Sequence, residues 1–299
     1  MELRVLRYFL AVAREGSVTG AAKVLHVTQP TLSRQLRELE EELGVRLLVR
    51  HSHSVSLTPD GMRLRKRAEE VVDMIEKTEA EFAVREETIG GDIHIGAGET
   101  RGMRHVAAII QEIRNEHPDV RIHLHSGNLE DVAERLDKGL LDFGILIQPA
   151  DLSKYDYVNL PEKDVWGVIT RRDGPLASRS VIRREDLLDR PLLLSRQVIR
   201  RTSARNDFIE WFKDDFRKLH VAGTYNLVYN AALLAESGIG HVLSIDGLVN
   251  TSADSELCFR LLEPRLETGL NIVWKKYQVL SPAADVFLQK IRQAFGETD

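Results

Sequence analysis

The sequence has few of the residues that mark secreted, zinc-binding and membrane proteins. Its 299 residues include a single cysteine, Cys258, which excludes an internal disulfide and leaves no cysteine pair for a zinc site. Cys258 stands in an apolar stretch, so we expect an inert core residue. No segment approaches the ~20 consecutive apolar residues that a membrane helix needs. These absences predict a soluble protein in a reducing, cytoplasmic setting, without a membrane partner.

The N-terminus has a short apolar run that does not continue. Tyr8 to Ala13 is apolar, but Arg14 and Glu15 follow it directly. The run is too short for the core of a signal peptide. We therefore expect the chain to stay in the cytoplasm.

The residues that are present suit a globular protein with more than one domain. Hydrophobic residues make up 43% and charged residues 29% of a chain longer than a typical single domain. The net charge of -5 is unevenly distributed, since residues 1–65 hold ten Lys/Arg against seven Asp/Glu. A mildly basic segment on an acidic body is expected where only the front of the protein contacts phosphate.

The first residues predict short helices separated by tight turns. Apolar residues recur at helical spacing from Leu3 to Ala13, and Gly16 is expected to end that helix before Ser17, an N-cap. Thr28 is expected to cap a third helix that has Pro30 in its first turn, where the missing N–H costs nothing.

The third helix divides into an apolar stripe and a polar face. Leu32, Leu36, Leu39 and Leu43 follow spacings of four, three and four, so we expect them to be buried. The opposite face begins with side chains suited to a major groove, because Gln and Arg can read base edges and Ser and Thr can hold phosphates. These outward residues are Gln29, Thr31, Ser33, Arg34 and Arg37.

Simpler interpretations of this face remain open. Arg34 and Arg37 are compatible with plain surface charges, and Arg37 is within reach of two nearby glutamates. Gln29 and Ser33 are compatible with an ordinary helix start.

A two-stranded wing and a long helix are expected next. Residues 45–58 alternate loosely around the polar tip His51 to Ser54. From Pro59 to Thr88 one helix carries an apolar seam that it cannot bury alone, which predicts a dimer; packing of the seam on the protein's own body is the alternative. Gly90-Gly91 then supplies a hinge. The seam consists of Leu64, Ala68, Val71, Ile75, Thr78 and Phe82.

From Asp92 onward, strand and helix patterns alternate. Such alternation implies parallel sheets covered by helices on both faces, with ligands at the carboxyl ends of the strands. The series occurs twice, so we expect two doubly wound lobes with a cleft between them. The expected strands are 93–97, 120–125, 143–147, 165–170, 241–245 and 271–274, with another near Val221, and the expected helices are 104–115, 129–138, 207–216 and 227–236.

Apparent catalytic and metal-binding signals are incomplete. Gly96-Ala97-Gly98 follows a strand, but Arg101 stands where a dinucleotide-binding loop needs its third glycine. His94, His123 and His125 lie on strands, and no carboxylate spacing completes a metal site with them. We expect no catalytic residue, no metal and no cofactor other than a small-molecule co-inducer, and therefore not an enzyme.

A set of residues at fixed spacing runs through the first 50 positions. It comprises Leu3, Arg4, Phe9, Val12, Ala13, Gly16, Ser17, Ala21, Ala22, Leu25, Thr28, Gln29, Pro30, Leu32, Ser33, Gln35, Leu39, Glu40, Leu43, Gly44, Leu47 and Arg50. This set resembles the winged helix-turn-helix signature of the LysR family of bacterial transcriptional regulators. Val18, Thr28 and Leu48 depart from that signature by changes that keep apolar or hydroxyl character.

The resemblance implies a domain order that continues along the whole chain. An N-terminal all-α winged helix-turn-helix would occupy residues 1–58, and a linker and dimerisation helix residues 59–89. An α/β effector-binding domain similar to periplasmic binding proteins would occupy residues 90–299. Its lobe I would comprise residues 92–161 and 265–299, and its lobe II residues 162–264.

The resemblance also implies partners and residue roles. A homodimer or homotetramer would bind an interrupted palindrome in double-stranded DNA, and would activate or repress transcription through RNA polymerase. Arg50 would support the wing on the DNA backbone. The residues that would face DNA are Gln29, Pro30, Thr31, Ser33 and Arg34, next to Arg37.

For the sensor, the resemblance points to a small, often anionic, effector in the cleft between the lobes. Thr100 matches a position that holds a carboxylate, and helix N-termini are anion sites in general; Arg101 would neutralise the charge. Thr100 is equally compatible with a helix cap, and Arg101 and Arg196 with solvated or salt-bridged residues within a lobe. The other residues at strand ends or loops facing the cleft are Asn128, Gln148, Ser195, Arg196, Gln197 and Asn226.

A second function class uses the same two lobes. A solute-binding protein or an enzyme would bind its ligand there, with the front of the chain serving only for dimerisation. Periplasmic solute-binding proteins need export, for which we expect no signal here. Turnover without DNA binding would favour this class.

Overall fold

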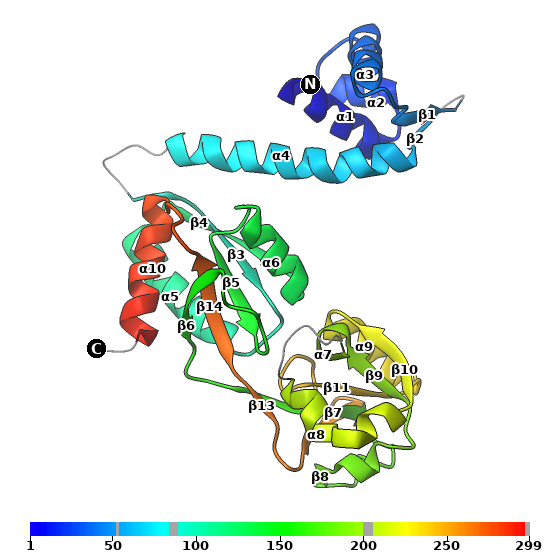
Figure 1. The fold of residues 1–299 in the computed structure, drawn as a ribbon, viewed down its shortest axis with the longest axis vertical. Coiled ribbons are helices and arrows are strands. Elements are labelled where there is room, and N and C mark those ends of the chain that lie inside the picture. The colour runs from blue at the N-terminus through cyan, green and yellow to red at the C-terminus, as the bar shows by residue number, and fades with distance from the viewer. Residues whose placement is uncertain (52–53, 84–88, 200–205, 297–299) are drawn as a thin grey trace. The chain divides into compact units, whose positions relative to one another are not determined.

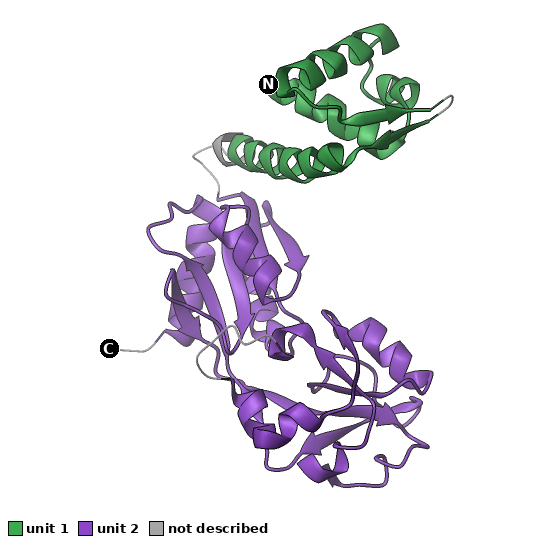
Figure 2. Ribbon diagram, turned by 45° about the vertical axis from the view of Figure 1, so that its right-hand side comes forward, with its two compact units in different colours: residues 1–83 green, residues 84–299 purple. Residues whose placement is uncertain are grey.

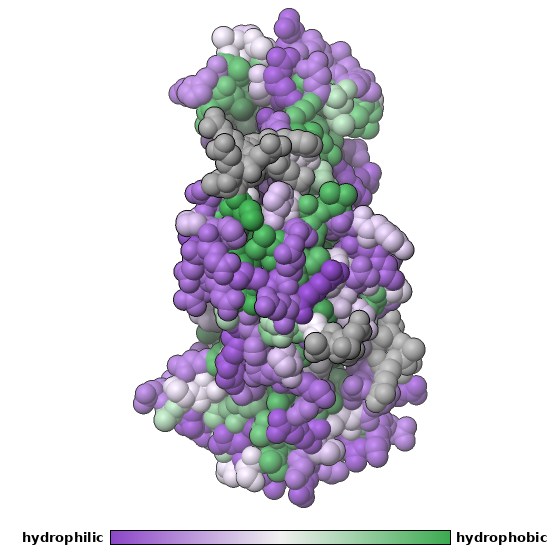
Figure 3. Space-filling view, turned by 90° about the vertical axis from the view of Figure 1, so that its left-hand side faces the viewer, coloured by the Kyte–Doolittle hydropathy of each residue, from purple (hydrophilic) through white to green (hydrophobic). Residues whose placement is uncertain are grey.

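The computed structural model describes residues 1–51, 54–83, 89–199 and 206–296. It divides into two compact units, Met1–Ala83 and Val84–Asp299 (Figures 1 and 2). Over these ranges, no helix combines the length and apolar character needed to cross a membrane. Figure 3 shows one face, where hydrophilic residues predominate and hydrophobic residues form smaller patches. Scattered apolar residues are ordinary on a protein surface, and a larger contiguous patch suggests a contact.

The first unit is a winged helix-turn-helix with a long helix packed against it. Gly16 adopts a φ of 60° at the end of α1, and Ser17 Oγ accepts a hydrogen bond from Gly20 N, as the sequence predicts. Thr28 Oγ1 caps α3 by accepting from Thr31 N. The elements are α1 (Leu3–Glu15), α2 (Val18–Val24), α3 (Gln29–Leu43), β1 (Leu48–Arg50), β2 (Val55–Leu57) and α4 (Pro59–Ala83).

The buried stripe of α3 is shorter than predicted. Leu32, Leu36 and Leu39 are at most 2% exposed, but Leu43 is 39% exposed, so its predicted burial is wrong. Leu43 is the last residue of α3, beyond the part of the helix that packs on the core. Ser33 is only 8% exposed, against the prediction that it lies on the outward face. It directly follows Leu32 and precedes Leu36 by one turn, so it borders the stripe.

Part of the apolar side of helix α4 is buried within the first unit. Ala68 and Val72 are buried in the core of this unit and Leu64 packs against it, so packing on the protein's own body accounts for this part of the helix. Val71 is 43% exposed and Thr78 is exposed as well. The side chain of Phe82, and residues 84–88 of the predicted helix, lie outside the described residues.

Lobe I of the second unit is a five-stranded sheet of order β4-β3-β5-β14-β6. Figure 1 shows α5 and α10 on one face and α6 on the other. Ile93, Val106 and Phe287 lie in the larger core, beneath α5 and α10. Its elements are β3 (Gly91–Ala97), α5 (Met103–Glu116), β4 (Val120–Ser126), α6 (Leu129–Asp137), β5 (Phe143–Ile147), β6 (Tyr155–Asn159), β14 (Leu270–Lys275) and α10 (Pro282–Phe295).

Lobe II is built on a second sheet, of order β10-β9-β11-β7-β12-β8, with β13 paired to β7. Cores on its two faces contain Phe208 and Phe212 on one side and α9 residues such as Ala231 on the other. Its elements are β7 (Asp164–Arg171), β8 (Val181–Ile182), η1 (Arg184–Asp186), β9 (Leu192–Ser195), α7 (Arg196–Ile199), α8 (Asp207–Phe212), η2 (Lys213–Lys218), β10 (Val221–Tyr225), α9 (Val228–Glu236), β11 (His241–Ile245), β12 (Leu257–Leu262) and β13 (Glu267–Thr268).

Both sheets are mixed, so the prediction of purely parallel sheets is wrong in part. The strand triplets β4-β3-β5 and β10-β9-β11 are parallel, as the alternation of strands and helices predicts. The chain crosses from β6 to β7 and later returns through β12 to β14. The returning strands pair antiparallel, β14 with β5 and β6, and β12 with β7.

We expect Gly61→Ala to destabilise the first unit by about 1–3 kcal/mol, because a Cβ at Gly61 would lie 2.1 Å from the carbonyl oxygen of Leu47. Gly20→Ala is the matched control, since its Cβ would make only ordinary contacts, the nearest at 3.5 Å, in a helix that favours alanine. Amide hydrogen exchange in α1 and α3 measures the effect. Slow exchange in both variants would contradict the close approach of α4 to the wing.

Candidate functional site

The first half of α3 presents a polar surface. Gln29, Pro30, Thr31 and Arg34 are all exposed, as predicted for residues that contact DNA. The hydroxyl groups of Thr28 and Thr31 lie 2.8 Å apart and share a hydrogen bond. The exposed residues are held in place by the buried leucines on the other side of the same helix.

Ser33 and Arg50 join α3 to the wing. Arg50 Nη1 donates a hydrogen bond to Ser33 Oγ over 3.1 Å. Arg50 remains exposed on β1, whereas Ser33 is buried. Ser33 therefore positions Arg50, and its hydroxyl is turned toward the wing.

The two arginines of α3 differ in their surroundings. Arg34 Nε lies 3.7 Å from Glu38 Oε1, and the Arg34 side chain is 70% exposed. Such a surface pair contributes little, so Arg34 is free to leave Glu38 for another anion. Arg37 is exposed, and the described part of the chain offers it no carboxylate within 4.0 Å. One of the glutamates within its reach, Glu40, instead accepts the backbone N–H groups of Leu47 and Leu48.

A cavity lies between the two lobes of the second unit, with about 540 Å³ of space that is partly open to solvent. Five of the predicted effector residues line it: Asn128, Gln148, Ser195, Gln197 and Asn226. Its other lining residues are Gly98, Glu99, Gly127, Ile147, Trp166, Val198, Tyr225, Leu227, Val228, Ser244, Ile245 and Leu248.

The lining residues sit where parallel strands end. In lobe I, Gly98, Gly127 and Ile147 stand at the carboxyl ends of β3, β4 and β5. In lobe II, β9, β10 and β11 end at Ser195, Tyr225 and Ile245, which are also lining residues. Ligands of α/β proteins bind at such ends, so the sequence pattern predicts the place of this cavity.

Thr100 holds the segment where the chain crosses between the lobes. Its Oγ1 donates to Asp164 Oδ2 over 2.5 Å and accepts from Gly102 N, and both Thr100 and Asp164 are buried. Thr100 is not among the described residues that line the cavity. Burial raises the pKa of Asp164 above its ordinary value, against the hydrogen bonds from the Thr100 hydroxyl and the Arg101 N–H.

Arg101 and Arg196 also lie outside the described lining of the cavity. Arg101 Nη1 forms an ion pair with Asp246 Oδ2 over 3.2 Å. Asp246 directly follows β11 in lobe II, so this ion pair joins the two lobes and is not the salt bridge within a lobe that the sequence left open. Arg196 is exposed and its Nε lies 3.4 Å from Thr224 Oγ1.

Residues that line the cavity form two of the hydrogen bonds between the lobes. Glu99 Oε2, from the loop after β3, accepts the N–H of Val228 at the start of α9 over 2.8 Å. Gln197 Nε2, from α7, donates to the carbonyl oxygen of Ile147 over 3.1 Å. Gln148, by contrast, is bonded within lobe I, because its Nε2 donates to Asn271 and its Oε1 accepts from Ala150 N.

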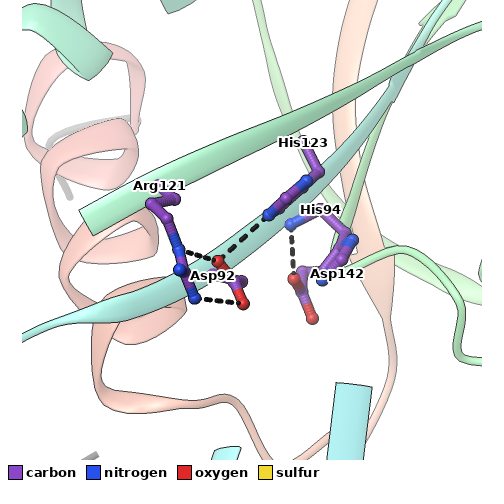
Figure 4. Close-up of polar contacts among 5 residues, drawn as sticks. All are labelled: Asp92, His94, Arg121, His123 and Asp142. Atoms are coloured by element: carbon purple, nitrogen blue, oxygen red, sulfur yellow. Dashed lines mark hydrogen bonds and ion pairs between the residues drawn. The ribbon is translucent and has the colours of Figure 1, made fainter. Parts of the chain in front are cut away.

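A separate polar cluster lies toward the amino ends of β3 and β4 (Figure 4). The rings of His94 and His123 stack 4.7 Å apart, and His123 Nε2 lies 3.0 Å from Asp92 Oδ1. Potential ligand atoms of these three residues lie within 4.8 Å of one another. The expectation that no carboxylate joins the histidines is therefore wrong, since Asp92 is two positions before His94 on the same face of β3.

The carboxylate of Asp92 is already neutralised within this cluster. Arg121 donates from Nε and Nη2 to the two oxygens of Asp92, over 2.7 and 3.1 Å. Burial alone would raise the pKa of Asp92, but the hydrogen bonds from Arg121 and His123 outweigh it and hold the pKa below its ordinary value. The guanidinium supplies the positive charge that a metal ion would bring, so we interpret the cluster as an ion-pair network.

Comparison with known families decides the identity of the chain. Residues 86–296 match the LysR substrate binding domain, and residues 3–62 match the bacterial regulatory helix-turn-helix protein of the lysR family. The chain belongs to the LysR family. It is a DNA-binding transcriptional regulator with a domain for an effector, from a family of regulators and not of enzymes.

Similar proteins match the whole chain or about two thirds of it. The HTH-type transcriptional regulator YvbU of Bacillus subtilis (strain 168) is 29% identical over 299 residues, which cover 99% of each chain. The DNA-binding transcriptional dual regulator OxyR of Escherichia coli (strain K12) is 34% identical over 194 residues, 65% of this chain and 63% of its own.

Solved structures of LysR regulators share the fold. The crystal structure of CbnR, a LysR family transcriptional regulator, has a TM-score of 0.77 at 21% identity, over 99% of this chain and 100% of that one. Full-length CbnR complexed with its target DNA has a TM-score of 0.74 at 22% identity, over 98% and 100%. At these identities the likeness concerns the fold alone.

Sequence reasoning missed several residues of this LysR regulator's cavity. Glu99 stands between Gly98 and Thr100 directly after a predicted strand, a position that could have revealed it. Asp164, the partner of Thr100 outside the cavity lining, directly precedes a predicted strand and gives no such signal. Trp166 and Tyr225 lie on strands, where an aromatic residue is more often part of a core than of a binding site.

We expect Thr100→Val to raise the pKa of Asp164 further, because the variant loses the hydroxyl that donates to the carboxylate. NMR titration of the Asp164 carboxyl carbon measures this. A raised pKa in the folded state means that the folded protein holds more protons, so its free energy of unfolding falls as pH rises from the unfolded pKa through the folded one.

The control for this prediction is Thr170→Val. Thr170 is a buried threonine on the same strand as Asp164, and its Oγ1 lies 2.8 Å from His241 Nδ1 instead. An unchanged pKa of Asp164 in Thr100→Val would show that burial alone sets its value.

Proposed function

We propose that two copies of the chain bind one DNA operator through α3 of each copy, and that a small molecule in the cavity between the lobes controls transcription through RNA polymerase. The observation that carries the DNA part is the exposed polar first half of α3, built on a helix with a buried apolar stripe. A helix of this kind fits the major groove with its N-terminal residues at the base edges.

The side chains of this surface suit different parts of DNA. Arg34 can donate two hydrogen bonds to a guanine, and Gln29 can pair with an adenine. Thr31 and the N-terminal turn of α3 are suited to a phosphate. Arg50, held on the wing by Ser33, would contact the DNA backbone beside the groove.

The exposed side of α4 supports a dimer. Val71 belongs to the predicted seam and is 43% exposed, although its neighbours Ala68 and Val72 are buried against the chain's own core. Pairing with α4 of a second copy would cover Val71, and a two-fold dimer matches a palindromic operator.

The cavity between the lobes is suited to an effector that changes their closure. The hydrogen bonds from Val228 N to Glu99 and from Gln197 to Ile147 depend on how the lobes approach each other. A molecule that contacts both sides would stabilise one degree of closure over others. Asn128, Ser195 and Asn226 are among the polar residues that line the cavity.

We expect Arg34→Ala to weaken binding to operator DNA by about tenfold or more, because a bidentate contact with a base is worth ~1–3 kcal/mol. The measurement is selection of bound fragments from sheared genomic DNA, followed by titration of the enriched fragments. The wild type should enrich a few promoter fragments that the variant loses.

The control is Arg217→Ala, which removes an exposed arginine from η2 in lobe II. A uniform loss of affinity for all fragments in Arg34→Ala, with a smaller salt dependence, would assign Arg34 to a phosphate instead of a base. Absence of any preferred fragment for the wild type would count against recognition through α3.

We expect Val71→Asp to weaken the dimer by about tenfold or more, since pairing would bury a charge without a partner. Sedimentation equilibrium over a range of protein concentrations measures the dissociation constant. Val221→Asp is the matched control, because Val221 on β10 is also 43% exposed. Equal dimerisation of both variants would place the contact elsewhere.

A further inference from the structure

The cavity between the lobes has an unusual charge for a site expected to take an anion. Glu99 is the one charged residue among the described residues that line it. The remaining polar lining residues are neutral amides and hydroxyl groups, together with the indole and phenol of Trp166 and Tyr225. A carboxylate ligand would meet repulsion from Glu99 in this space.

The helix starts beside the cavity already carry carboxylates of the chain itself. Asp131 Oδ2 accepts the N–H of Asn128 in the capping box of α6. Glu99 Oε2 accepts the first N–H of α9, that of Val228. Asp164 is bonded to Thr100 and Arg101 in the turn before α5. The carboxylates of Asp131 and Glu99 place negative charge at these helix starts, which opposes the binding of an anion there.

Two of the lining residues keep a side-chain oxygen that has no recorded partner among the described residues. Gln197 uses its Nε2 on the carbonyl oxygen of Ile147, so its oxygen remains as an acceptor. Glu99 uses one oxygen on Val228, and the structure records no partner among the described residues for the other. Gln148 offers no such oxygen, because its Oε1 accepts from Ala150 N. Glu99 and Gln197 can thus accept hydrogen bonds from a ligand.

We infer that the cavity takes a cationic effector, one with an ammonium or amidinium group that pairs with Glu99. The inference rests on the proposed function, because it assigns a ligand class to the effector cavity. It differs from the anionic effector that the family resemblance implies. The ligand's N–H groups would fill the free oxygens of Glu99 and Gln197, and the faces of Trp166 and Tyr225 suit a cation.

A cation at this position would also act on closure of the lobes. Glu99 belongs to the loop after β3 in lobe I, and its second oxygen holds the start of α9 in lobe II. Neutralising Glu99 from the cavity side leaves its bond to Val228 in place. The bound molecule would therefore strengthen the contact between the lobes instead of displacing it.

The test uses the full-length protein and fractions of a small-molecule extract from the organism that encodes it. Loading a cation exchanger at about pH 3, where carboxylates are protonated, retains every amine. An anion exchanger then separates acids without an amine from neutral molecules. The measurement is the midpoint of heat unfolding of the wild type, Glu99→Gln and Glu185→Gln with each fraction.

The amine fraction should raise the midpoint of the wild type and of Glu185→Gln, which removes an exposed carboxylate on η1. Glu99→Gln retains an oxygen for Val228 N, so it should fold, but should need about tenfold or more of the amine fraction for the same rise.

Three results would overturn the inference. Stabilisation by the acid or the neutral fraction alone would reject a cationic effector while leaving an effector-binding function in place. An equal response of Glu99→Gln and the wild type to the amine fraction would remove Glu99 from recognition. No response to any fraction would reject the proposed effector function itself, and the inference with it.

Discussion

The double crossing of the chain between its two sheets constrains the rest of residues 84–299. The chain leaves lobe I after β6 and returns to it as β14, and β13 pairs with β7 on the way. Because only these segments connect the lobes, each lobe keeps its own parallel triplet of strands. The carboxyl ends of both triplets line the same cavity, and every loop that follows a strand can contribute a side chain there.

Several helices begin beside one cavity, and carboxylates of the chain itself lie at their first turns. The first turn of a helix has unpaired N–H groups and a partial positive charge. Asp131, Glu99 and the buried Asp164 supply acceptors at these turns. Burial raises the pKa of Asp164 because it disfavours the charged carboxylate. The hydrogen bonds from Thr100 and Arg101 favour the charged form and offset part of this effect. Among the described residues that line the cavity, Glu99 carries the one charge.

The sequence pattern predicts a structural feature correctly where that feature depends only on residues within one helix or strand. Gly16, Ser17 and Thr28 act within one or two turns, so the predicted helix boundaries and caps agree with the structure. Burial of Ser33 and exposure of Leu43 depend on where the rest of the unit contacts α3, which helical spacing alone cannot state. The antiparallel pairing of β14 depends on residues more than a hundred positions away. Likewise, the resemblance and the predicted strand ends pointed to five residues that line the cavity, but could not show that Thr100 contacts Asp164.

The two proposed binding surfaces differ in how many of their side chains are hydrogen-bonded to the rest of the fold. Gln29, Thr31 and Arg34 lie on the face of α3 opposite its buried leucines, so their side chains can be exchanged with little effect on the core. The cavity residues are joined to the fold by their own hydrogen bonds, as in Gln148 to Asn271 and Glu99 to α9. Single substitutions on α3 would therefore be enough to change the operator sequence that the protein prefers. A change of effector must also supply new partners for the backbone and amide groups that Glu99 and Gln148 now satisfy.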